Sequence, residues 1–76
     1  MIYCVEGDDL RRWFVANGFR PSGGDAISEI WVRPSTGTIL VAPAPNVLGR
    51  VPENLLADAF DAAGVPPPKL PVTWCD

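Results

Sequence analysis

The residues of this 76-residue chain that could do chemistry are mainly carboxylates, because it contains nine Asp and Glu, two cysteines and no histidine. A serine or cysteine nucleophile would lack the histidine base that activates it. Two thiols without histidine leave a tetrahedral zinc ion short of ligands. We therefore expect no catalytic residue, no metal and no cofactor, and a protein that is not an enzyme.

The most one-sided carboxylates lie in segment 53–63, which has helical periodicity and no basic residue. Glu53, Asp58 and Asp61 are expected opposite its apolar arc. Asp58 and Asp61 are three residues apart, so they are neighbours on a helix, and a solvated face is the ordinary explanation of such a pair. The other explanation is a partner-binding patch that occupies a basic groove through charge complementarity.

Further acidic residues and one aromatic residue are candidates for the same patch. They are Asp8, Asp9, Asp25 and Glu29, with Trp31 as an apolar anchor. A large aromatic residue is a common anchor of an interface, although burial in the core is an equal expectation for Trp31. Arg11 and Arg12 are adjacent and are expected on a solvated helix face. The sequence alone does not decide between binding and solubility for these charges.

The overall charge bears on the class of partner. The net charge is −3 and the isoelectric point is about 4.6. The six basic residues are scattered, whereas phosphate binding needs clustered Lys and Arg. We therefore expect a protein partner with a basic surface and no direct binding of nucleic acid.

The location is expected to be cytoplasmic. No stretch approaches the roughly 20 apolar residues of a membrane helix. The beginning of the chain lacks the basic and apolar regions of a secretion signal. Cys4 and Cys75 are then expected to be reduced and to behave as small buried hydrophobic residues.

The pattern of apolar and turn residues predicts one domain over residues 1–76. Strands are expected at 2–5, 26–33, 38–42 and 70–75, with a brief extended segment at 19–22 and helices at 8–17 and 53–63. Gly18 and Gly64 are expected to end the helices. The order β-α-β-β-α-β predicts an α+β two-layer sandwich, an antiparallel sheet of three to four strands with two helices on one face. A ferredoxin-like split βαββαβ arrangement fits the same order.

The central hairpin is expected to be turned by Pro34-Ser35-Thr36-Gly37, and Gly23-Gly24 is expected to form an earlier turn. Alternation along the first strand places Ala26, Ser28, Ile30 and Val32 on one face, which is expected to face the core. In the second helix Leu55, Leu56, Ala59, Phe60 and Ala63 form the apolar arc. Pairing of the first and last strands would bring Cys4 near Cys75.

About residues 8 to 65 also carry a resemblance to a known family. The segments are Leu10 to Phe19, Ile30 to Pro34 with Gly37, Ile39 to Pro43, Pro52 to Leu56 and Ala62 to Val65. In these segments the chain resembles the HicA family of small mRNA-interferase toxins. The resemblance implies an αβββα layer similar to a double-stranded-RNA-binding domain, with a HicB-like antitoxin as partner.

The family's activity depends on a histidine at the start of the middle strand. The corresponding segment, Gly24 to Glu29, has none, and the chain is acidic where the family is typically basic. No catalytic residue is transferred. Two hypotheses follow: an acidic, non-enzymatic inhibitor like those of phages and mobile elements, including anti-CRISPR proteins, or a diverged HicA-like toxin–antitoxin component that binds RNA or an antitoxin.

Overall fold

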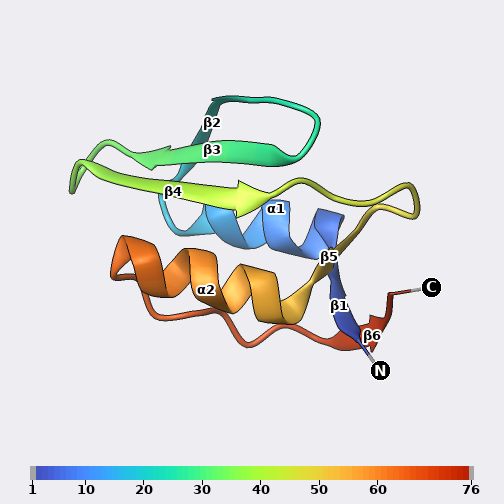
Figure 1. The fold of residues 1–76 in the computed structure, drawn as a ribbon. Coiled ribbons are helices and arrows are strands. Elements are labelled where there is room, and N and C mark those ends of the chain that lie inside the picture. Colours follow the sequence, from blue (N-terminus) through green and yellow to red (C-terminus); the bar gives the residue numbers. More distant parts are fainter. Residues whose placement is uncertain (1, 76) are drawn as a thin grey trace.

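The computed structural model describes residues 2–75, which form a layer of sheet covered by a layer of helices (Figure 1). The elements are β1 (Tyr3–Glu6), α1 (Gly7–Ala16), β2 (Arg20–Gly24), β3 (Ser28–Arg33), β4 (Thr38–Pro43), β5 (Arg50–Pro52), α2 (Glu53–Ala63) and β6 (Val72–Trp74). The predicted α+β class is confirmed. The strands divide into two antiparallel sheets of three strands each, whereas a single sheet of three to four strands was expected.

The larger sheet has the strand order β2-β3-β4, and both helices lie on one of its faces (Figure 1). The hairpin of β3 and β4 has the predicted turn at residues 34–37, where Gly37 adopts a φ of 69°. In its register Trp31 lies opposite Leu40, and Val32 lies opposite Ile39. Because paired residues share a face, one face carries Trp31 and Leu40, and the other carries Val32 and Ile39.

The predicted core face of β3 is wrong. Trp31, which alternation puts on the face opposite the predicted core face, is 3% exposed and stacks on Phe14 with ring centroids 4.4 Å apart. Ile30 and Val32 are only partly buried on the outer face, and Ala26 is exposed before the strand begins. Both faces of β3 carry large apolar side chains, so alternation could not choose between them. Trp31 lies on the core face because its flat indole ring can stack on the Phe14 ring beneath it.

Both helices end as predicted, at a glycine with a left-handed backbone. Gly18 has a φ of 81° and Gly64 has a φ of 70°. The next residue donates its N–H back into the helix, from Phe19 to the Phe14 carbonyl at 2.9 Å and from Val65 to the Phe60 carbonyl at 3.0 Å. These are the hydrogen bonds of a Schellman motif, and they direct the side chains that follow the helices into the core.

The smaller sheet has the order β5-β1-β6, so the first and last strands pair as predicted. Cys4 and Cys75 form a disulfide, with their Cα atoms 5.0 Å apart. The expectation of two reduced thiols is therefore wrong, although Cys4 is buried as expected. The three-residue strand β5 lies in a segment that was expected to be loop and first helical position, because it is too short to show alternation.

The predicted turn at Gly23-Gly24 is also wrong, because both glycines belong to β2. A register shift interrupts the pairing of β2 with β3 between Pro21 and Gly23. At Gly24 the backbones approach so closely that an added Cβ would lie 2.3 Å from the Ser28 carbonyl oxygen. The glycine therefore permits close strand pairing there, and the chain reverses at the residues that follow.

We expect the Cys4–Cys75 disulfide to contribute strongly to stability, because it joins residues 71 apart in the sequence. Replacing both by alanine should lower the free energy of unfolding by about 2–4 kcal/mol. Urea denaturation of the two proteins, each with and without reductant, measures this. The double variant should not respond to reductant, and an equal response of both proteins would contradict the prediction.

Candidate functional site

The predicted carboxylates of α2 occupy two different sides of the helix. Leu56 and Phe60 are buried and define the side that faces the core. At about 100° per residue, Asp58 and Asp61 lie on the opposite side, and both are exposed. Glu53 lies in the first turn on a flank of the helix, where it lines a separate small hollow with Ile2. The structure therefore brings together Asp58 and Asp61, but not Glu53.

Leu55 corrects the predicted apolar arc of α2. It was expected on the buried side, yet it is 49% exposed. Phe60 turns its ring toward α1, with its centroid 5.7 Å from that of Phe14. Leu55 lies about 140° around the helix from Phe60, so it points away from α1. The buried side of α2 is narrower than the apolar pattern indicated.

Asp58 and Asp61 border an open surface hollow of about 590 Å³. Its other wall is apolar, since Pro66 and Pro67 run beside the helix after Gly64 (Figure 1). We call the hollow lined by Asp58, Asp61, Pro66 and Pro67 the acidic hollow. A Lys or Arg side chain has the matching form, because its aliphatic stem can pack on the prolines while its cation meets the carboxylates.

The acidic hollow has no internal neutralisation. Between residues 2 and 75 the ion pairs are Arg12 with Asp9 and Arg50 with Glu6. Asp61 also lies in the last turn of α2, which contains no basic residue. A carboxylate there meets the negative end of the helix dipole, and Asp58 one turn earlier adds repulsion between like charges. Both residues are therefore placed where they oppose helix stability.

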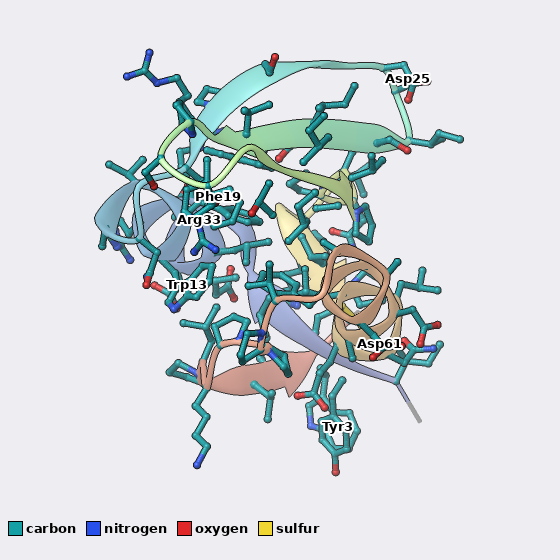
Figure 2. All side chains as sticks on the ribbon, turned by 90° about the vertical axis from the view of Figure 1, so that its left-hand side faces the viewer. Tyr3, Trp13, Phe19, Asp25, Arg33 and Asp61 are labelled. Atoms are coloured by element: carbon teal, nitrogen blue, oxygen red, sulfur yellow. A yellow bond between two sulfur atoms is a disulfide. The ribbon has the colours of Figure 1, made fainter. Side chains whose placement is uncertain are left out.

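Asp25 is far from the α2 carboxylates and shapes a turn. Figure 2 shows it at the loop between β2 and β3, in the opposite layer from Asp61. Its Oδ1 atom accepts hydrogen bonds from the N–H groups of Ile27 and Ser28, at 3.0 and 2.9 Å. An aspartate that bonds the backbone two residues on forms an Asx turn, so the local role of Asp25 is to reverse the chain.

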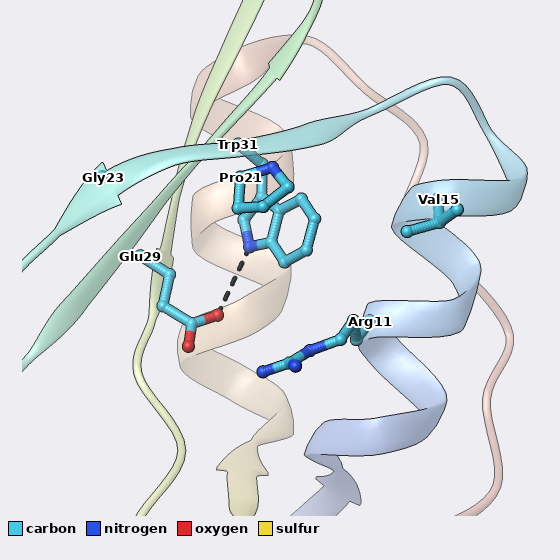
Figure 3. A pocket seen from close by; sticks show the side chains of 6 residues that line it. All are labelled: Arg11, Val15, Pro21, Gly23, Glu29 and Trp31. Atoms are coloured by element: carbon cyan, nitrogen blue, oxygen red, sulfur yellow. Dashed lines mark hydrogen bonds between the residues drawn. The ribbon is translucent and has the colours of Figure 1, made fainter.

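Glu29 and Trp31 line a pocket of about 350 Å³ between α1 and the β2–β3 pair. The Trp31 Nε1–H group donates a hydrogen bond to Glu29 Oε1 at 3.3 Å (Figure 3). Arg11 extends from α1 toward the Glu29 carboxylate. Trp31 is therefore a wall of this pocket, and it does not protrude as an interface anchor.

This pocket could not be predicted from the sequence. Arg11 had been assigned to a solvated helix face, and its approach to Glu29 depends on how α1 packs under the sheet. The exposed β2 strand overhangs the helix, with Pro21 and Gly23 on the upper rim. No local spacing signals such an arrangement, because the lining residues come from three elements.

The two aspartates of α1 complete the predicted set. Both lie in the first turn, where a carboxylate favours the helix dipole. Asp9 is paired with Arg12, and Asp8 lines a smaller hollow that adjoins the Glu29 pocket. The predicted acidic residues therefore form separate groups, and the acidic hollow is the group with two exposed carboxylates that make no ion pair within residues 2–75.

Over residues 2–75, no group of three or more His, Cys, Asp or Glu is arranged to hold a metal ion. None of the helices in that range has the length and apolar character needed to cross a membrane.

Comparison with protein-family models, curated proteins and solved structures found no match. The resemblance to the HicA family consequently stays a prediction. The larger sheet contributes three strands between α1 and α2, as the αβββα order of this resemblance implies, but β5 of the smaller sheet adds a fourth strand before α2. A shared arrangement of elements does not carry an activity, so function has to be argued from the surfaces described above.

We expect Asp25 to act through the geometry of its turn. Asp25→Ala removes the acceptor of two backbone N–H groups and should lower the free energy of unfolding by about 1 kcal/mol. Asp25→Asn keeps an oxygen acceptor and removes the charge, so its stability should stay close to that of the parent. Urea denaturation compares the three proteins. Equal losses for both variants would show that the charge matters and not the turn.

Proposed function

We propose that this protein is a non-enzymatic inhibitor that binds a basic surface of a partner protein through the acidic hollow. Such basic surfaces normally hold nucleic acid, and small acidic proteins of phages and mobile elements, including anti-CRISPR proteins, block them. The observation that carries the proposal is the exposed, unneutralised pair Asp58 and Asp61 beside the apolar wall of Pro66 and Pro67.

Physical chemistry supports a binding role for these carboxylates. Residues that oppose the stability of their own helix need another explanation, and sites of function are where such conflicts concentrate. Asp61 meets the negative end of the α2 dipole, and Asp58 repels it. A cation supplied by a partner would relieve both effects at once. The electrostatic repulsion that destabilises α2 in the free protein therefore adds to the favourable free energy of binding when a partner cation neutralises it.

The form of the hollow favours a protein partner over a small cation. An exposed carboxylate pair alone binds a hydrated ion weakly, because each charge is already well solvated. The prolines add an apolar surface that a Lys or Arg stem can cover, and the rigid polyproline backbone loses little entropy on binding. Acidic charge on the rest of the chain adds long-range attraction to a basic partner.

A cytoplasmic location belongs to the same proposal. The cytoplasm keeps most protein thiols reduced, whereas a disulfide between Cys4 and Cys75 fits an oxidising compartment. Cytoplasmic function therefore requires that the dithiol form folds. The acidic hollow lies on α2 and the polyproline segment, so loss of the bridge between β1 and β6 would leave its lining residues in place.

We expect the double variant Asp58→Asn with Asp61→Asn to change stability and binding in opposite directions. The free energy of unfolding should rise by about 0.3–1 kcal/mol, because an unfavourable dipole contact and a like-charge repulsion are removed. Affinity for the partner should fall at least tenfold, or by about 1.4 kcal/mol. The partner is first captured from lysate with the tagged parent, and titration calorimetry then compares the variants.

Asp8→Asn is the matched control. It removes a charge at the favourable end of α1, so stability should fall slightly while partner binding is retained. Partner binding that survives the α2 double variant unchanged would remove the acidic hollow from the proposal. Binding that does not weaken with rising salt would contradict its electrostatic basis.

A second candidate, a diverged HicA-like component, is favoured by the three-stranded sheet β2-β3-β4 that lies between α1 and α2 in the sequence, although β5 of the smaller sheet also precedes α2. In this function the chain would bind RNA or a HicB-like antitoxin without cleaving RNA, because it contains no histidine. The same capture experiment separates the candidates. RNA enriched at low salt and lost steeply at high salt, or a small antitoxin-like protein, supports the second candidate. A basic nucleic-acid-binding protein supports the first.

A further inference from the structure

The outer edge of β4 carries unpaired backbone groups. Ala44 N–H donates to the Ile27 carbonyl at 3.0 Å, which continues the ladder between β3 and β4. Hydrogen-bonded positions alternate along an antiparallel pair, so Leu40 is bonded to β3 while Ile39 and Val41 direct their N–H and C=O groups outward. Within residues 2–75 no other strand pairs with this edge, because β4 is the last strand of its sheet.

The other strand edges between residues 2 and 75 carry protective features. Proline, irregular pairing and short length are the usual means of preventing edge-to-edge association. On the β2 edge these are Pro21 and the register shift that follows it. Strands β5 and β6 have three residues each. The six residues of β4 contain no charge and no irregularity, and a proline occurs only at the end.

The side chains beside this edge are apolar on both layers. Above it lie Ile39, which is 61% exposed, and Val41, which is 53% exposed. Below it, α2 packs against β4. A helix stripe of spacing i, i+4 and i+7, formed by Leu55, Ala59 and Ala62, lies on the side of α2 away from α1. An open strand edge with apolar side chains above and below it is suited to pair with another strand edge that also has apolar side chains on both sides.

We propose that two copies of this chain associate through their β4 edges, in antiparallel orientation around a two-fold axis. With the axis at Leu40, Ile39 of each copy pairs with Val41 of the other. Four backbone hydrogen bonds then form between the copies, and the two sheets join into one of six strands. The register is self-complementary, as a two-fold interface requires, and it brings no charges of Thr38–Pro43 together because there are none.

The size of the contact sets its strength. A six-residue edge is about 20 Å long, and the sheet and helix layers together are about 20 Å thick, so each copy buries on the order of 400 Å². Twice this area is below the roughly 1,200 Å² of a standard stable interface. The association is therefore a weak, reversible dimer. Each copy has a net charge of −3, so salt should strengthen the dimer by screening repulsion.

Sedimentation equilibrium of the full chain between about 10 μM and 1 mM tests the dimer, in the concentration range expected for a weak interface. The parent should shift from monomer to dimer. Ile39→Lys should stay monomeric throughout, because it places a charged side chain from each copy in the apolar edge contact. The control Ile27→Lys adds the same charge at an isoleucine that is 77% exposed on the β2–β3 turn, and it should dimerise like the parent. Thermal unfolding of both variants confirms that they are folded.

Amide hydrogen exchange locates the contact. The N–H groups of Ile39 and Val41 should exchange quickly in the dilute monomer and slow at least several-fold at high concentration, while exposed amides of β2 stay unchanged. A parent that remains monomeric at about 1 mM overturns the proposal. So does a dimer in which Ile39 and Val41 still exchange quickly, or protection that needs an added partner protein. Partner binding through the acidic hollow weakens with salt, so its failure is distinguishable from failure of the dimer.

Discussion

The stacking of Phe14 between Trp31 and Phe60 is the contact on which the rest of the structure depends. The ring is fully buried, and it joins α1 to β3 on one side and to α2 on the other. A domain of this size has few interior positions, so one such ring connects both layers. Because α1 carries Phe14 and α2 packs on the same ring, both helices lie on the face of the sheet that carries Trp31, and the other face stays open.

That constraint explains which features the sequence could predict. Helix ends and the hairpin turn depend on local backbone preferences, and Gly18, Gly64 and the segment 34–37 adopt the expected conformations. Which face of β3 points to the core depends on which side chain fits against Phe14. Alternation within the strand carries no information about a ring that lies 17 residues earlier in the chain. Pairing of the terminal strands was predictable from their apolar character. The oxidation of Cys4 and Cys75 was not.

The candidate site likewise has a part that the sequence could predict and a part that it could not. Asp58 and Asp61 were predictable as neighbours, because helical spacing fixes their relation within one element. Glu53 lies on another side of the same helix. Asp25, on the loop between β2 and β3 (Figure 2), and Glu29, on β3, lie in the sheet layer. The approach of Arg11 to Glu29 is a product of tertiary packing. Sequence spacing therefore identifies charges that share an element and fails for charges on different elements that tertiary packing brings near each other.

The open sheet face and the exposed acidic hollow both follow from the small size of the chain, which supplies a single layer of helices. With a single layer of helices, the chain buries Trp31 and Leu40 but leaves Ile39 and Val41 in water. Pairing of two β4 edges would place two acidic hollows on one particle, both on the helix side. Linked sites bind a repeated or extended basic surface more tightly than one site, because the second contact is intramolecular. Weak self-association would then make partner binding depend steeply on protein concentration.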